Sequence, residues 1–130
     1  MEPAQVTTPP GSDARLLVVE DDAVVARALE RSLRRAGYRV TRAASCKEAR
    51  AVEGPFGAGV FDIDLVDGDG VTLAMELCES HIVARCVFFT GSASSEHHAR
   101  AQTVGPVVLK SAPLALLLDP LRAEFERAGH

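Results

Sequence analysis

The chain has 130 residues, of which 47% are hydrophobic, and a formal net charge of −4. At this length one domain is the default, and about two thirds of the unfolded surface can be buried, so we expect a packed core. The acidic balance argues against a nucleic-acid partner, no apolar run is long enough to cross a membrane, and the polar start is unlike a signal peptide. We therefore expect a cytoplasmic protein that does not bind DNA directly. Its three cysteines form no Cys-x-x-Cys pair and are expected to be reduced thiols that pack as small apolar side chains.

The chain begins with a leader and a first strand. Residues 1–14 carry three prolines and no hydrophobic periodicity, which predicts a disordered leader before one domain over residues 15–128. Residues 15–19 contain a continuous apolar run that is typical of a buried strand. Two acidic residues follow at once, Glu20 and Asp21, and therefore stand at the carboxyl end of that strand.

A helix, a strand and a short helix come next. Asp22 is the predicted N-cap of a helix over residues 23–36, which Gly37 ends. Four arginines fall mostly on its outer side and are expected to form a solvated face: Arg27, Arg31, Arg34 and Arg35. Residues 38–43 alternate between apolar and polar, which suits a half-buried or edge strand, and Ser45 then caps a short helix.

The third strand ends at the most informative residue of the chain. Residues 58–61 form an apolar run that stops at Asp62, and residues 62–70 are acidic and punctuated by glycine. The Asp-Gly dipeptides in this stretch favour turns. Asp69 or Gly70 then leads into a helix with three apolar side chains expected in the core: Leu73, Met75 and Leu77.

Two more strands and a last helix complete the pattern. Residues 84–89 read as a strand that Thr90 closes, residues 92–103 as a weak polar helix, and residues 106–109 as a short strand that ends at Lys110. A final helix is predicted from its apolar stripe: Leu114, Leu117, Leu118, Leu121 and Phe125.

Pro120 lies inside that last stripe. It removes a backbone hydrogen bond, which predicts a kink or a break. Asp119 and Pro120 would suit the cap and the first residue of a restarted helix.

Five strands that alternate with five helices predict an α/β fold, a flavodoxin-like doubly wound five-stranded parallel sheet with strand order 2-1-3-4-5. In this order the first and third strands are neighbours, so Glu20, Asp21 and Asp62 converge at one edge. Thr90 and Lys110 end the fourth and fifth strands at the same edge. Clustered carboxylates attract Mg²⁺, a carboxylate can accept a phosphoryl group, and a lysine and a hydroxyl can hold that group.

The motifs that carry these residues resemble the receiver domain of two-component response regulators, and the resemblance covers nearly everything after the leader. The matching segments are Leu16-Leu17-Val18-Val19-Glu20-Asp21-Asp22, Phe61-Asp62-Ile63-Asp64-Leu65 with Gly70 further on, Phe89-Thr90-Gly91, and Leu109-Lys110. The resemblance implies that Asp62 is the phosphoacceptor and that Thr90 and Lys110 hold the phosphoryl group. It also implies four ligands for Mg²⁺: Asp21 directly, Glu20 through water, Asp62, and the backbone carbonyl of Asp64.

The same resemblance implies the partners. The phosphoryl donor would be a phosphohistidine on a bacterial sensor histidine kinase or phosphotransfer protein, and the output partner stays open. We expect a monomer or weak dimer. We expect no enzymatic activity beyond self-catalysed phosphotransfer and slow autodephosphorylation.

Several positions depart from the family pattern. Val66 and Ser111 stand where proline is usual, and Val107 stands where a tyrosine or phenylalanine usually couples to the threonine. The bond after the lysine is typically cis in the family, but before serine a cis bond costs about 3 kcal/mol, which leaves the setting of Lys110 open. The segment between Thr90 and Lys110 is short, so we expect a small fourth helix.

Two alternatives remain. The stretch Phe61-Asp62-Ile63-Asp64-Leu65-Val66 resembles the nucleophile loop of haloacid-dehalogenase-like phosphohydrolases, in which the second aspartate is the acid/base. Those enzymes usually carry this loop on their first strand, and Glu20 and Asp21 have no place in that scheme. The other alternative is a receiver-like interaction module that is never phosphorylated, against which the retained acidic and basic positions argue.

Overall fold

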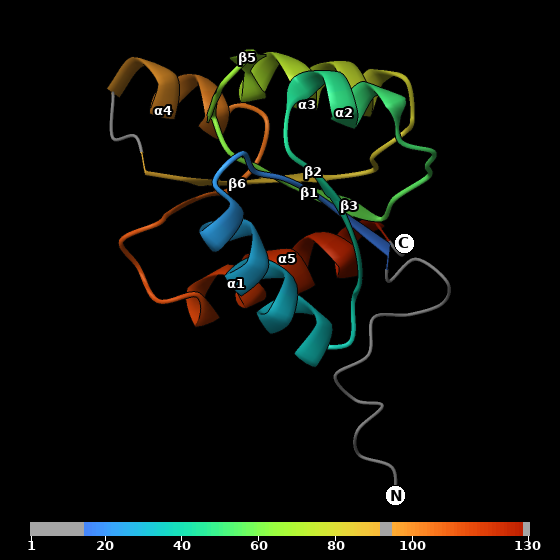
Figure 1. Cartoon of the computed structure of the whole chain (residues 1–130), viewed down its shortest axis with the longest axis vertical. Coiled ribbons are helices and arrows are strands. Elements are labelled where there is room, and N and C mark those ends of the chain that lie inside the picture. The colour runs from blue at the N-terminus through green and yellow to red at the C-terminus, as the bar shows by residue number, and fades with distance from the viewer. Residues whose placement is uncertain (1–14, 92–94, 129–130) are drawn as a thin grey trace, which may run out of the picture.

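The computed structural model describes residues 15–91 and 95–128, so the predicted leader lies outside the described residues. Its centre is one sheet of five parallel strands in the order β2-β1-β3-β6-β7 (Figure 1). The strands are β1 (Arg15–Val19), β2 (Arg39–Ala43), β3 (Ala58–Phe61), β6 (Cys86–Thr90) and β7 (Val107–Leu109). Counted along the chain this order is 2-1-3-4-5, so the predicted topology is confirmed.

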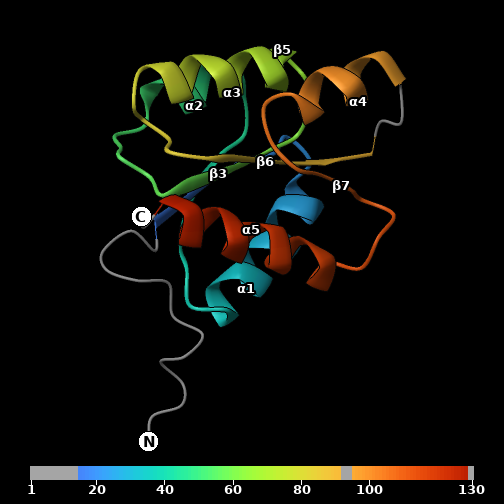
Figure 2. The ribbon, with the colours of Figure 1, turned by 180° about the vertical axis from the view of Figure 1, so that it is seen from behind.

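Helices cover both faces of the sheet, as Figures 1 and 2 show from opposite sides. One face carries α1 (Ala23–Arg35) and α5 (Ala115–Ala128), and the other carries α2 (Cys46–Ala51), α3 (Gly70–Glu79) and α4 (Ser95–Gln102). The five predicted helices are all present, and α4, with eight residues, is as small as expected.

Two hydrophobic cores result from these three layers. Alternate side chains of β1 enter opposite cores: Leu17 and Val19 pack under α2 and α3, whereas Leu16 and Val18 pack against α1 and α5. All four are at most 1% exposed. Burying each such side chain stabilises the fold by roughly 1.5–3 kcal/mol, so the continuous apolar run makes β1 a central strand.

The predicted caps begin their helices. Asp22 Oδ1 accepts hydrogen bonds from the backbone N–H groups of Val24 and Val25 at 2.9 and 3.2 Å. Ser45 Oγ accepts from the N–H of Glu48 at 3.1 Å, and Asp69 accepts from the N–H at the start of α3. Each cap satisfies an N–H that has no partner inside its helix.

Two local predictions about the acidic segment and α3 need correction. The segment after Asp62 forms a two-stranded hairpin that the sequence pattern did not indicate, β4 (Asp64–Leu65) antiparallel to β5 (Gly68–Asp69). Met75 was expected in the core, but its side chain is 42% exposed. Met75 lies two positions beyond Leu73, about 200° further round the helix, and therefore points away from the sheet.

Of the predicted kink or break at Pro120, the break is wrong, because α5 runs as one helix through it, and the kink stays a prediction. Pro120 cannot donate to the carbonyl four residues earlier, that of Leu116. Leu116 is 54% exposed, so that carbonyl stands on the solvent side of the helix. Leu117 and Leu121 are buried on the opposite side and hold both halves of the helix against the sheet.

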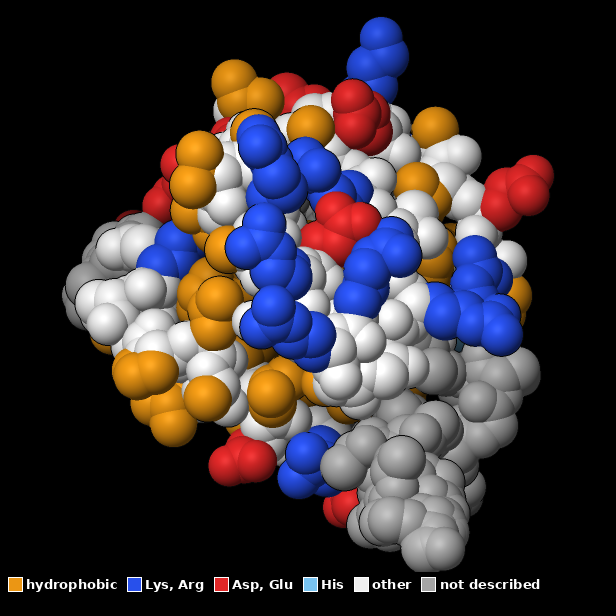
Figure 3. Space-filling view, turned by 60° about the horizontal axis from the view of Figure 1, so that its bottom comes forward, with side chains coloured by type: hydrophobic (Ala, Val, Ile, Leu, Met, Phe, Trp, Pro, Cys, Tyr) orange, Lys and Arg blue, Asp and Glu red, His pale blue; other side chains and the backbone are white. Residues whose placement is uncertain are grey.

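The arginines of α1 form the expected exposed face. Arg27, Arg31, Arg34 and Arg35 are all exposed. Figure 3 shows Lys and Arg side chains gathered on the side of the molecule that α1 and α5 cover. Glu30, also on α1, pairs with the guanidinium of Arg34 at 2.7 Å. Over residues 15–91 and 95–128, no helix combines the length and the apolar character that a membrane crossing needs.

Candidate functional site

Backbone hydrogen bonds hold the end of β1 beside the ends of β3 and β2. The N–H of Asp62 donates to the carbonyl of Val19 at 3.0 Å, and the N–H of Glu20 donates to the carbonyl of Ala43 at 3.0 Å. Glu20 and Asp62 are only 3% and 6% exposed, whereas Asp21 is exposed. One ligand oxygen from each of these three carboxylates lies within 4.8 Å of the others. The structure thus brings together the three carboxylates that the strand order predicts at this edge.

Lys110 reaches the same cluster from the end of β7. Its backbone N–H donates to the carbonyl of Thr90 at 2.8 Å, which continues the pairing of β6 and β7 by one residue. Its Nζ lies 3.0 Å from Asp62 Oδ2 and 2.8 Å from Glu20 Oε1. Burial lowers the pKa of Lys110, but the neighbouring carboxylates of Glu20 and Asp62 outweigh burial and raise the pKa above its ordinary value. One charged ammonium is therefore shared between two buried carboxylates.

The buried carboxylate of Glu20 has only part of the polar partners that its charge needs. Its Oε2 accepts from the N–H of Asp22 at 3.0 Å. Its Oε1 is buried and forms an ion pair with Lys110 Nζ, but it has no hydrogen-bond partner. Burial raises the pKa of Glu20, the neighbouring Lys110 ammonium and the hydrogen bond from the N–H of Asp22 offset part of the rise, and repulsion by Asp62 adds to it.

A divalent cation fits this donor set. A buried carboxylate oxygen without a hydrogen bond, next to two further carboxylates, is an oxygen-rich site of the kind that Mg²⁺ prefers. A cation there would also relieve the repulsion that raises the pKa of Glu20.

Thr90 ends the strand beside β3, and Gly70 adjoins the backbone of Asp62. Thr90 is fully buried at the last position of β6, in register with Leu109. Gly70 donates its N–H to the carbonyl of Ile63 at 2.7 Å, and a Cβ placed on Gly70 would lie 1.8 Å from the carbonyl oxygen of Asp62. Only glycine allows α3 to start this close to the Asp62 backbone, a requirement that no local sequence signal revealed.

The hairpin next to Asp62 is tied to α4. Asp64 is exposed, and its carboxylate lies 3.6 Å from the Nδ1 of His97. Arg100 forms an ion pair with Asp69 and donates to Thr72 Oγ1 at 2.6 Å. Burial raises the pKa of Asp69, but its hydrogen bonds, chiefly the one from Arg100, outweigh burial and lower the pKa below its ordinary value. These contacts depend on the placement of α4, so sequence reasoning did not single out His97 or Arg100 as neighbours of the site.

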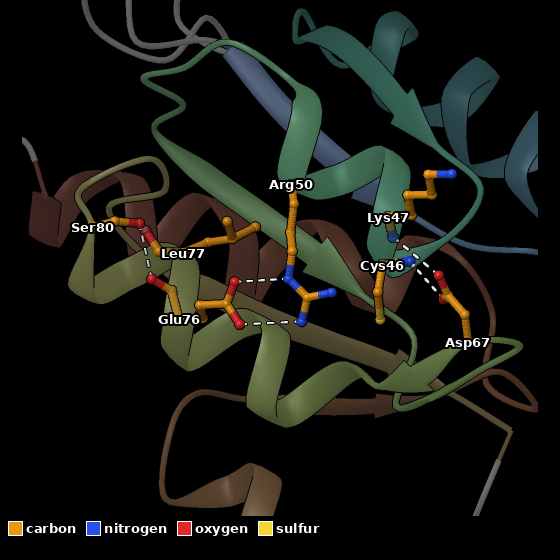
Figure 4. A network of polar contacts seen from close by, with 7 residues as sticks. All are labelled: Cys46, Lys47, Arg50, Asp67, Glu76, Leu77 and Ser80. Atoms are coloured by element: carbon orange, nitrogen blue, oxygen red, sulfur yellow. Dashed lines mark hydrogen bonds and ion pairs between the residues drawn. The ribbon is translucent and has the colours of Figure 1, made fainter.

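A second set of contacts ties the hairpin to α2 (Figure 4). The two carboxylate oxygens of Asp67 accept from the N–H groups of Cys46 and Lys47 at 2.8 and 3.1 Å. Further along, Arg50 of α2 makes a two-pronged ion pair with Glu76 of α3 at 2.8 and 3.1 Å. The turn that was expected only to reverse the chain thus also fastens α2 beside α3.

Known proteins of similar sequence and structure share this architecture. A protein-family model described as the response regulator receiver domain matches residues 16–118, which is most of the chain. The chain belongs to the response regulator receiver family. A curated relative, the response regulator receiver protein CpdR of Brucella abortus, is 37% identical over 83 residues, which cover 62% of this chain and 68% of the relative.

Solved receiver structures superimpose closely. A CheY-like receiver domain protein from Methanospirillum hungatei is 26% identical, with a TM-score of 0.76 over 88% of this chain and 95% of the other. A response regulator from Burkholderia pseudomallei, described with a phosphorylated aspartic acid, a calcium ion and citrate, is 29% identical, with a TM-score of 0.70 over 88% of this chain and 70% of the other.

Membership of the receiver family decides between two of the earlier interpretations. Receivers are signalling phosphoacceptors of two-component systems rather than enzymes of the usual kind. The haloacid-dehalogenase alternative places its nucleophile on the first strand, whereas Asp62 here follows β3, the third strand along the chain. That alternative therefore has no support left.

Two departures from the receiver pattern have visible structural outcomes. The Lys110–Ser111 peptide bond is trans, since the cis bond found among the described residues is Gly54–Pro55. Val107 is partly buried and packs against the same core as Ala101 of α4. The position that is usually aromatic in receivers therefore holds a small aliphatic side chain under α4.

Proposed function

We propose that Asp62 accepts a phosphoryl group from a phosphohistidine on a sensor histidine kinase or phosphotransfer protein, in a reaction that needs Mg²⁺. The observation that carries this proposal is the ammonium of Lys110, 3.0 Å from Asp62 Oδ2 inside a cluster of three carboxylates. An isolated buried carboxylate would be a poor nucleophile for an anionic phosphoryl group, because like charges repel. Here a fixed cation stands at the point of attack.

The chain's own residues account for the transfer. A carboxylate oxygen of Asp62 attacks phosphorus, the bond from phosphorus to the histidine nitrogen breaks, and an aspartyl phosphate forms. Lys110 can then turn from its carboxylate partners to a phosphoryl oxygen, and the Thr90 hydroxyl can donate to another. Glu20, Asp21, Asp62 and the backbone carbonyl of Asp64 would hold Mg²⁺, which when bound supplies positive charge for the phosphoryl oxygens.

The relatives support this proposal. The Burkholderia response regulator, 29% identical, carries a phosphorylated aspartic acid and a calcium ion. By analogy we propose slow autodephosphorylation and no other catalysis, a cytoplasmic location in a bacterium, and a monomer or weak dimer that changes its affinity for an output partner on phosphorylation.

Phosphorylation by a small acyl phosphate tests the acceptor. Intact-mass measurement after incubation with acetyl phosphate and Mg²⁺ should show one added phosphoryl group, which is absent with a chelator and absent in Asp62→Asn. Asp67→Asn is a matched control, since it removes an acid of the same segment that is not in the cluster, and it should still be phosphorylated. Phosphorylation that persists in Asp62→Asn would overturn the assignment. A wild-type protein that neither acetyl phosphate nor a phosphorylated kinase modifies would favour the interaction module instead.

A melting experiment tests the metal site separately. Mg²⁺ should raise the melting temperature of the unphosphorylated protein, because it binds the folded state alone. Asp21→Ala and Asp62→Ala should each blunt the effect. If both variants respond like the wild type, the metal binds elsewhere.

A further inference from the structure

Two cysteines meet at the end of the sheet opposite to the acidic cluster. Cys78 lies in the last turn of α3, and Cys86 is the first residue of β6. Their sulfur atoms are 2.8 Å apart, although the residues are eight positions apart in the chain, and both are free thiols. This separation is shorter than the ordinary contact of unbonded sulfur atoms. Cys86 begins the strand that Thr90 ends, about 13 Å away, so the pair is distinct from the phosphoacceptor site.

The two thiols differ in access. Cys86 is 2% exposed, and its thiol can also donate to the carbonyl of Ala74 at 3.7 Å. Cys78 is partly exposed. Both line a cavity of about 740 Å³, whose wall also includes Arg85 and Gln102. A small reagent in this cavity meets the sulfur of Cys78 first.

The two thiols also differ in acidity. The hydrogen bond from Cys86 lowers the pKa of Cys78, burial opposes this, and the charge of Arg85 adds to the lowering. The pKa of Cys86 is raised, by its hydrogen bond with Cys78 and by burial. The more accessible thiol is thus the one that ionises first, which is the arrangement of an attacking thiol beside a resolving thiol.

We propose that Cys78 and Cys86 form a dithiol site that peroxide oxidises to an intramolecular disulfide. The Cys78 thiolate attacks one oxygen of hydrogen peroxide, the O–O bond breaks, and the leaving hydroxide takes up a proton to become water. The thiol of Cys86 then loses its proton and attacks the sulfur of the Cys78 sulfenic acid, whose S–O bond breaks to release a second water. Overall the two thiols give up two electrons and two protons, and one peroxide becomes two waters. The bond would join the end of α3 to the start of β6.

Cys46 provides an internal comparison. It is 1% exposed, is not among the residues that line the cavity, and has a pKa raised by burial and by the neighbouring Asp67. Its thiol should therefore stay reduced under conditions that oxidise the other two.

Peptide mapping after peroxide treatment tests the proposal. The wild-type protein, treated with hydrogen peroxide and alkylated after denaturation, should lose about 2 Da, show a peptide that joins Cys78 to Cys86, and leave Cys46 as the single alkylated thiol. A thiol reductant should restore all three thiols. Bonds between chains, a bond that involves Cys46, or oxidation of Cys46 as fast as Cys78 would each overturn the proposal.

Single variants separate the two roles. Cys86→Ser should let the sulfenic acid of Cys78 accumulate, so that dimedone labels it, whereas Cys78→Ser should leave Cys86 unlabelled because its sulfur is buried. Labelling of Cys86 in Cys78→Ser, or none of Cys78 in Cys86→Ser, contradicts the assigned roles. The wild-type mapping needs neither variant to fold, and neither experiment depends on phosphorylation of Asp62.

Discussion

The two halves of the sheet are built differently. Every residue of β3 and four of the five residues of β1 are buried, and backbone hydrogen bonds fix the carboxylates that follow these strands. β7 has only three residues, all partly exposed, and α4 above it is short and mostly exposed. The acids therefore follow β1 and β3, which form the rigid half of the sheet. Lys110 follows β7, which together with α4 forms the thinner half, and Thr90 ends β6, the strand between the two. A change of state needs the least free energy where few apolar contacts must be broken, so the thinner half is where phosphorylation should be transmitted.

The largest expected effect comes from crowding the rigid half. In Gly70→Ala the new Cβ would lie 1.8 Å from the Asp62 carbonyl oxygen, so α3 or the Asp62 backbone must move. We expect a loss of about 3 kcal/mol in the free energy of unfolding, together with loss of phosphorylation. Denaturant titration and the acetyl phosphate assay would measure both.

Gly91→Ala is the matched control on the thinner half. Among the residues that the structure describes, a Cβ there would meet only Lys110 Cδ, at an ordinary 3.7 Å, so the free energy of unfolding should change by less than about 0.5 kcal/mol. Equal costs for the two substitutions would show that the halves do not differ in rigidity at this edge.

The next effect comes from removing the cation that joins the halves. Lys110→Ala leaves Glu20 and Asp62 buried without their ammonium. Without Mg²⁺ the free energy of unfolding should fall by about 2 kcal/mol. This is less than for a fully buried pair, because the Lys110 side chain is 23% exposed. The folded pKa of Lys110 is raised, so its contribution is complete below the ordinary lysine pKa and is lost only as pH rises through the higher folded value. The difference from wild type should therefore persist at neutral pH. Mg²⁺ should recover part of the loss.

Lys47→Ala controls for the loss of a lysine as such. Lys47 is exposed, so its replacement should change stability by less than about 0.5 kcal/mol and leave the response to Mg²⁺ intact. A Lys110→Ala protein as stable as Lys47→Ala would mean that the buried carboxylates do not depend on the ammonium.

A smaller, local effect should reveal the route of the signal. Val107 is too short to act as the rotating aromatic of other receivers, whereas Arg100 and His97 link α4 directly to the hairpin beside Asp62. A beryllofluoride mimic should therefore alter amide exchange in residues 91–105 more than in β7, and Arg100→Met should reduce that change. Protection changes centred on β7, with residues 91–105 silent, would show that the usual route survives without its aromatic.

The sequence predicted the features that depend on a residue's own segment better than those that depend on neighbouring elements, for a physical reason. The bounds of β1 and β3 and the caps Asp22 and Ser45 are confirmed, because a buried strand needs a continuous apolar run and a cap needs its own side chain. The hairpin, the exposure of Met75 and the uninterrupted α5 depend on what lies across from each element. The same is true of the Cys78–Cys86 contact, since no spacing rule reveals that the end of α3 meets the start of β6.

The smallest effect concerns the fastening of the acidic hairpin to the rigid half. Asp67 accepts two backbone N–H groups at the start of α2, and these hydrogen bonds lower its pKa below the ordinary value. A lowered folded pKa means that the stabilisation is complete above the unfolded pKa and is lost as pH falls through the folded one. Asp67→Asn should therefore melt slightly below wild type at pH 7, and the gap should close in acid, at a pH below the usual aspartate range. Asp119→Asn, which alters an exposed acid of α5 that lies 4.0 Å from Arg122 of the same helix, should show no such gap. If the difference in melting temperature between Asp67→Asn and wild type stays constant into strong acid, the negative charge of Asp67 is not what holds the hairpin to α2.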